Sequence, residues 1–80
     1  MNVLLRFSYT NRSQSKLLMI VEPWACEYWI EPNESVDVEV RGGSHRGRLE
    51  IEQTPEGLTI YGWEGTLISV ARDGKEVPSS

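Results

Sequence analysis

The chain has 80 residues, of which 39% are hydrophobic and 25% charged, and its formal net charge is −4. A chain of this length fits one domain with little surplus stability, so we expect a shallow surface site and not a large empty cavity. The acidic balance repels polyanions and argues against general nucleic-acid binding. The ordinary share of apolar residues predicts a folded domain.

Cys26 is the only cysteine, so no intrachain disulfide can form. Small secreted domains usually depend on disulfides, which favours a reducing, cytoplasmic location. The first ten residues alternate apolar and polar side chains and do not resemble a signal peptide. The longest apolar run, residues 17–21, is far shorter than the ~20 residues that cross a bilayer. We therefore expect a cytoplasmic protein without membrane association.

Apolar and polar residues alternate along most of the chain, which predicts half-buried strands. The first strand is expected at residues 2–9, with apolar side chains at its odd-numbered positions. Residues 17–21 are apolar throughout and predict a central strand covered on both faces. Pro23 lacks a donor N–H and predicts a bend. The alternation resumes at Cys26–Ile30, which predicts a third strand.

The second half of the chain continues this pattern after a proline turn at residues 31–35. We expect strands at residues 36–41 and 48–53, joined by a flexible loop with several glycines. A second proline turn follows, and Asp73-Gly74 predicts a tight hairpin between the last two strands. The last three strands are expected at residues 58–63, Thr66–Arg72 and 75–77.

Seven or eight short strands at nearly regular spacing predict an all-β fold. We expect a small antiparallel β-sandwich, with a small closed β-barrel as the alternative. Low-complexity segments and long linkers are absent from the sequence. We therefore expect a single domain at residues 1–77 and a disordered tail at residues 78–80.

The inventory of reactive side chains argues against an enzyme. Cys26 and His45 form the only possible cysteine–histidine pair. Because Cys26 shares a strand face with Tyr28 and Ile30, it is better interpreted as a small buried hydrophobe than as a nucleophile. One histidine and one cysteine are too few ligands for a blue-copper or a structural zinc site. We expect no catalytic residue and no cofactor.

A hard-cation site has more support in composition, because four carboxylates flank one loop. If the strands before and after that loop paired directly, these carboxylates would crowd together and calcium would relieve their repulsion. Alternatively, the two strands lie in opposite sheets, or the acids form a solvated face closed by Arg41 and Arg48. We favour these alternatives and expect no metal. The four carboxylates are Asp37, Glu39, Glu50 and Glu52.

Basic residues concentrate around the same loop, at Arg41, His45, Arg46 and Arg48. Glycine allows backbone N–H groups to turn toward an anion, and arginine binds phosphate or carboxylate with two parallel hydrogen bonds. This combination indicates a candidate anion site. An exposed loop with solvated charges explains the composition equally well.

The aromatic residues carry the main functional hypothesis. The alternation places Trp29 outward between Glu27 and Glu31, and places Tyr61 and Trp63 outward together. Exposed rings beside carboxylates suit a contact surface for a partner protein, a second copy or a sugar ring. The alternative is that all three tryptophans lie in the core, since a one-residue register error exchanges the faces.

We therefore expect a non-catalytic binding or protein-interaction module that uses an exposed aromatic face, with a protein partner or self-association. A module that binds a carbohydrate or a small anion is the alternative, and an enzyme comes third. Tryptophan fluorescence distinguishes them, because emission from exposed indoles shifts when a partner or ligand covers them.

A resemblance rests on Glu22-Pro23-Trp24, Tyr28, Pro32 and the alternation at residues 36–40. With these features, residues 11–40 resemble small uncharacterised bacterial all-β proteins that share a Glu-Pro-Trp segment followed by an aromatic residue and a proline turn. The segment is also similar to the edges of immunoglobulin-like sandwiches. The resemblance implies an all-β fold and a bacterial origin, and it implies no activity, ligand or site residue.

Overall fold

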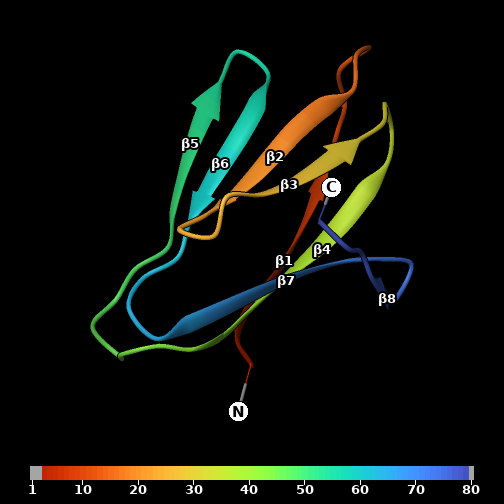
Figure 1. Ribbon diagram of the computed structural model, residues 1–80. Coiled ribbons are helices and arrows are strands. Elements are labelled where there is room, and N and C mark those ends of the chain that lie inside the picture. Colours follow the sequence, from red (N-terminus) through yellow and green to blue (C-terminus); the bar gives the residue numbers. More distant parts are fainter. Residues whose placement is uncertain (1–2, 80) are drawn as a thin grey trace.

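The computed structural model describes residues 3–79 and folds them into eight strands without a helix (Figure 1). Asn2, the expected start of the first strand, lies outside the described residues, as does Ser80 of the expected tail. Within residues 3–79 there is accordingly no helix of the length and apolarity that would cross a membrane. The strands are β1 (Val3–Thr10), β2 (Leu17–Glu22), β3 (Cys26–Ile30), β4 (Ser35–Gly42), β5 (Glu50–Thr54), β6 (Gly57–Tyr61), β7 (Thr66–Arg72) and β8 (Lys75–Glu76).

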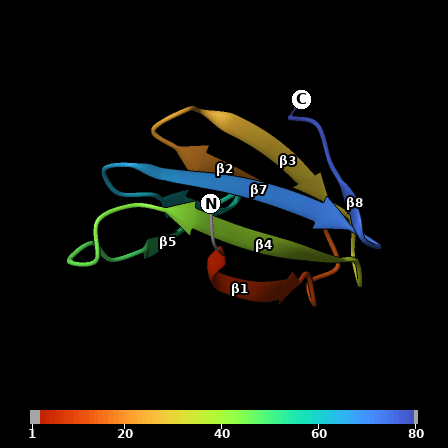
Figure 2. The same cartoon turned by 90° about the horizontal axis from the view of Figure 1, so that it is seen from below.

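The strands form two four-stranded sheets. Sheet A has the order β1-β4-β7-β8, and sheet B has the order β3-β2-β6-β5. Figure 2 shows β1, β4 and β7 side by side in one layer, with β2 and β3 in the other. The two packed sheets confirm the predicted all-β sandwich and not the closed barrel.

One pairing differs from the antiparallel prediction, because β2 and β6 run parallel. Only neighbouring strands joined by a tight turn are constrained to be antiparallel, and β2 and β6 are separated by three other strands. Sheet B is therefore mixed, while every pair in sheet A is antiparallel.

The core lies between the sheets and is built from alternate residues, as the two-residue period predicts. Met19 and Val21 of the central strand β2 are almost fully buried, and Tyr28 and Ile30 of β3 are buried beside them. The remaining buried apolar residues of the cluster come from β4, β6 and β7, and they are Val36, Val38, Leu58, Ile60 and Val70. Burial of this apolar area is the main force that holds the two layers together.

Two strand ends differ by two residues from the sequence-based expectation, and several others differ by one. β5 begins at Glu50 and not at Arg48, and β6 ends at Tyr61 and not at Trp63. β6 ends because the chain turns after Gly62, where the N–H of Thr66 donates to the Trp63 carbonyl oxygen. Gly62 itself still donates its N–H to the Glu22 carbonyl oxygen of β2. At the carboxyl end, Ser79 accepts a hydrogen bond from the N–H of Glu27.

Candidate functional site

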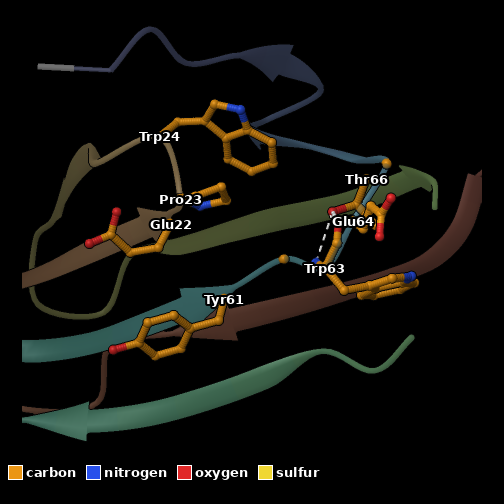
Figure 3. A pocket seen from close by; sticks show the side chains of 9 residues that line it. Glu22, Pro23, Trp24, Tyr61, Trp63, Glu64 and Thr66 are labelled. Atoms are coloured by element: carbon orange, nitrogen blue, oxygen red, sulfur yellow. Dashed lines mark hydrogen bonds between the residues drawn. The ribbon is translucent and has the colours of Figure 1, made fainter. Parts of the chain in front are cut away.

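A pocket of about 260 Å³ opens at the end of the sandwich where β2 and β6 leave sheet B (Figure 3). Its wall combines aromatic rings, carboxylates and a hydroxyl. We call it the aromatic pocket, and we define it by Glu22, Trp24, Tyr61, Trp63, Glu64 and Thr66. Figure 3 shows Trp24 across the pocket from Tyr61 and Trp63, whose rings point in opposite directions.

The turn between β2 and β3 positions Trp24. Ala25 has a positive φ of 57° and donates its N–H to Glu22 Oε1 at 3.0 Å, which closes the turn around Trp24. The indole remains 42% exposed. Gly62 lies close beneath it, since a Cβ at Gly62 would lie 3.5 Å from Trp24 Cη2. Trp24 therefore presents a large apolar surface to solvent at a fixed place.

Thr66 fixes the opposite wall of the pocket. Its hydroxyl accepts a hydrogen bond from the N–H of Trp63 at 3.1 Å and donates one to the Trp63 carbonyl oxygen at 2.6 Å. Thr66 is buried, so these bonds are shielded from water. The turn from Trp63 to Thr66 is thereby held in one conformation.

The indole of Trp63 is less available to a partner than the sequence predicts. Its Nε1 donates to the Ser44 carbonyl oxygen at 2.8 Å, and the ring lies against the backbone of Gly47. A Cβ at Gly47 would lie 1.7 Å from Trp63 Cδ1, so only glycine fits there. Part of the Trp63 ring therefore serves to fasten the β4–β5 loop to the end of sheet B.

Tyr61 lies among carboxylates. It pairs with Glu22 on one side and Glu50 on the other, and its hydroxyl donates to Glu52 Oε1 at 2.9 Å. The hydrogen bond to Glu52, followed by desolvation and the negative charges of these glutamates, raises the pKa of Tyr61. The outer face of sheet B is therefore electronegative beside the pocket.

The structure separates Trp29 from the other two rings. Trp29 is outward-facing and 42% exposed, as the alternation predicts, and Lys16 Nζ lies 5.0 Å from the centroid of its ring. However, Trp29 pairs with Leu18 near the start of β2, whereas Tyr61 pairs with Glu22 at its end. The residues predicted as one aromatic face therefore divide into two places.

The acidic residues predicted beside Trp29 remain on its strand or next to it. Glu27 lies on β3, and Glu31 is exposed directly after β3. Neither lines the aromatic pocket. Of the predicted contact residues, only Tyr61 and Trp63 are brought together there.

The predicted anion-binding residues are only partly brought together. Arg41 lies on β4 and forms an ion pair with Glu39. His45, Arg46 and Arg48 are exposed in the β4–β5 loop. The charge of Arg41 is therefore compensated within sheet A and does not add to the charge of the loop.

The calcium hypothesis required direct pairing between the strand that carries Asp37 and Glu39 and the strand that carries Glu50 and Glu52. These strands are β4 and β5, and they do not pair, because β4 lies in sheet A and β5 lies in sheet B. Among residues 3–79, no group of three or more histidine, cysteine, aspartate or glutamate side chains could hold a metal ion. Cys26 packs against the core cluster, whereas His45 is exposed in its loop.

Comparisons with protein-family models, curated proteins and solved structures give no match. Sequence reasoning missed Trp24 and Thr66. Trp24 follows a proline at a strand end, which is a signal for an exposed turn, but its approach to Gly62 and Trp63 is a product of the tertiary fold.

Proposed function

We propose that this protein is a non-catalytic interaction module that binds a cationic side chain of a partner protein in the aromatic pocket. The observation that supports the proposal is that three aromatic residues and two glutamates line one pocket. A lysine or arginine side chain is attracted to the face of an indole or phenol ring and forms charge-assisted hydrogen bonds with carboxylates.

The charges around the pocket favour a cation over an anion. Glu22 and Glu64 line it, while no lysine, arginine or histidine of residues 3–79 does so. The neighbouring acids that raise the pKa of Tyr61 add to the negative field. We therefore do not retain the small anion as a ligand of this pocket.

A carbohydrate is the second candidate, because Trp24 is 42% exposed and lies beside Glu22. An exposed indole gives a flat apolar surface for the apolar face of a sugar ring, and a carboxylate accepts hydrogen bonds from sugar hydroxyls. This candidate needs no cation on the ligand. The two candidates therefore differ in their dependence on ligand charge.

We also propose that the protein acts in the reducing cytoplasm of a bacterium. The single Cys26, which leaves no intrachain disulfide, supports the compartment. The resemblance of residues 11–40 to bacterial all-β proteins supports the origin.

The test uses NMR titration with short capped glycine peptides that contain one central lysine, arginine, glutamate or norleucine, and with a set of neutral oligosaccharides. We expect shifts of the Trp24 and Trp63 indole signals with the lysine and arginine peptides only. Shifts with a sugar alone would support the second candidate, and shifts with the norleucine peptide as strong as with lysine would contradict cation recognition.

Trp24→Ala and Trp29→Ala are matched variants, because both indoles are 42% exposed and only Trp24 lines the pocket. We expect Trp24→Ala to abolish binding of the lysine peptide and Trp29→Ala to retain it. The opposite result would move the interaction site to β3 and overturn the proposal.

A further inference from the structure

β5 is exposed on both of its faces, although it belongs to a sheet that covers a core. Ile51 pairs with the fully buried Ile60 but is itself 53% exposed. Ile51 is exposed because the sandwich is open on this side, where β5 is the edge strand of sheet B and β1 is the edge strand of sheet A. The space between these two edge strands is a groove of about 430 Å³, whose lining includes Tyr9, Leu17, Ile51, Gln53 and Leu58.

The backbone of β5 presents two residues at its free edge. Directly before β6, the carbonyl oxygen of Glu56 accepts a hydrogen bond from the N–H of Leu18 of β2, and directly after β6, the N–H of Gly62 donates one to the carbonyl oxygen of Glu22 of β2. The even-numbered residues of β6 therefore bond toward β2 and the odd-numbered ones toward β5, because these directions alternate along a strand.

The partners of those odd-numbered residues on β5 are Glu50, Glu52 and Thr54, which bond inward to β6. Ile51 and Gln53 must then direct their N–H and C=O groups away from β6, toward the free edge. Their side chains line the groove. A strand added at this edge would thus bond to Ile51 and Gln53 and place alternate side chains in the groove.

The negative charge of sheet B determines which kind of strand can pair with the β5 edge. The four strands of sheet B contain the acids Glu22, Glu27, Glu50 and Glu52 and no lysine or arginine. Glu50 and Glu52 are exposed along β5 itself. A second copy that paired its β5 antiparallel to this one would align glutamates with glutamates, which is unfavourable. Such charges protect an edge strand against self-pairing.

We propose that the β5 edge and its groove bind an extended segment of a partner protein in which apolar and basic residues alternate. The apolar side chains lie in the groove beside Ile51 and Leu58, and the basic side chains lie on the outer face beside Glu50 and Glu52. This is strand addition, in which main-chain hydrogen bonds give affinity and alternate side chains give specificity. The site is separate from the aromatic pocket and does not depend on its proposed function.

The probe is a capped peptide about six residues long, the length of an average strand, in which valine and lysine alternate. Isothermal titration calorimetry gives its affinity for the full chain. One control peptide has glutamate in place of lysine. The other keeps the sequence but carries N-methyl groups on alternate amides, which removes the donors that strand addition requires. We expect binding of the first peptide only.

Because a lysine peptide also suits the aromatic pocket, the titration is repeated with Trp24→Ala. We expect unchanged affinity of the alternating peptide for this variant. Loss of binding with Trp24→Ala would assign the peptide to the aromatic pocket and overturn the edge site. If the alternating peptide binds but the single-lysine peptides do not, the proposed function of the aromatic pocket is overturned and the edge site is not.

Two pairs of variants test the edge itself. Gln53→Pro removes an edge N–H without removing a bond to β6, and Gln53→Ala is its control. Glu50→Lys reverses the charge that faces the basic side chains, and Glu50→Gln is its control. We expect Gln53→Pro to abolish binding, Gln53→Ala to retain it, and Glu50→Lys to weaken it by about tenfold. Circular dichroism confirms that each variant is folded.

Amide hydrogen exchange gives a readout independent of affinity. We expect bound peptide to slow exchange at Ile51 and Gln53 and to leave Glu52, already bonded to β6, nearly unchanged. Equal binding of the N-methylated peptide would overturn strand addition. So would a concentration-dependent dimer in sedimentation velocity that Gln53→Pro dissociates, because a second copy would then occupy the edge.

Discussion

The side-chain amide of Asn11 donates a hydrogen bond from Nδ2 to the carbonyl oxygen of Ile30 at 2.9 Å. Asn11 follows β1 of sheet A and Ile30 ends β3 of sheet B, so this bond joins the ends of the two layers. Nδ2 also donates to the Ser15 carbonyl oxygen, and Oδ1 accepts from the N–H of Ser13. Asn11 is fully buried, so its amide replaces water for three backbone groups.

Asn11→Ala is expected to lower the free energy of unfolding by about 2–4 kcal/mol, because it removes the donor to the buried Ile30 carbonyl oxygen and the side-chain bonds to the backbone of Ser13 and Ser15. Urea denaturation measures the change. Ser13→Ala is the control, since its hydroxyl bonds to Asn11 Oδ1 from a more exposed position and its loss is expected to cost about 1 kcal/mol or less. Equal effects of the two substitutions would show that the amide does not hold the layers together.

Gly47→Ala is expected to displace the Trp63 ring and to lower the free energy of unfolding by about 1–3 kcal/mol. The reason is the 1.7 Å between the position of a Cβ and Trp63 Cδ1. Tryptophan fluorescence and thermal unfolding measure the displacement and its cost. Gly74→Ala is the control: φ at Gly74 is +81°, and a Cβ there meets nothing within 4 Å. Gly74→Ala is expected to cost stability through backbone strain alone and to leave the tryptophan emission unchanged. A Gly47→Ala variant with the same tryptophan emission as the unsubstituted protein would contradict the packing of Trp63.

Ile30→Ala and Trp29→Ala are truncations of neighbouring residues that are expected to differ in how much stability they cost. Ile30 is fully buried, so its truncation is expected to cost about 2–5 kcal/mol. Trp29 is outward-facing and 42% exposed, so a cost below about 1.5 kcal/mol is expected despite its larger side chain. Chemical denaturation of both variants tests the alternation of β3, which a cost of about 3 kcal/mol or more for Trp29→Ala would contradict.

Tyr61 is expected to titrate above its ordinary pKa of 10.0, first because its hydroxyl donates to Glu52. A raised folded-state pKa means that the contribution of Tyr61 to stability is complete below pH 10.0 and is lost as the pH rises through the folded value. Glu52→Gln is expected to lower the pKa of Tyr61, as measured by NMR titration of the assigned ring signals.

The same titration contains an internal control. Tyr28 also has a raised pKa, chiefly because of burial. It lies on β3 and faces the core, and its causes do not include Glu52. Glu52→Gln should therefore leave Tyr28 unchanged. A Tyr61 titration that does not respond to Glu52→Gln would contradict the hydrogen bond between the two side chains.

The strands were predictable from the sequence to within a few residues. β3 and β7 have the predicted bounds, because the two-residue alternation and the flanking turn residues define them locally. The parallel pairing of β2 with β6 was not predictable, because it joins residues about 40 positions apart and no local pattern records which distant strand is the neighbour.

The candidate site was predictable only in part. The alternation places Tyr61 outward, but it gives no information about Thr66, whose hydroxyl bonds to the backbone N–H and carbonyl oxygen of Trp63 within a turn. Asn11 shows the same limit: a polar residue after a strand indicates a turn, and its full burial follows only when the two layers meet.

The sequence by itself determined the class of secondary structure, the position of most strands and the face on which Trp29 lies, because each is a consequence of local periodicity. Only the tertiary structure decided that Trp24 joins Tyr61 and Trp63 around one pocket, and that Ile51 is left uncovered on the open side of the sandwich. The physical reason is that pockets and free edges arise where distant segments pack or fail to pack, and a side chain's own neighbours in sequence do not specify these contacts.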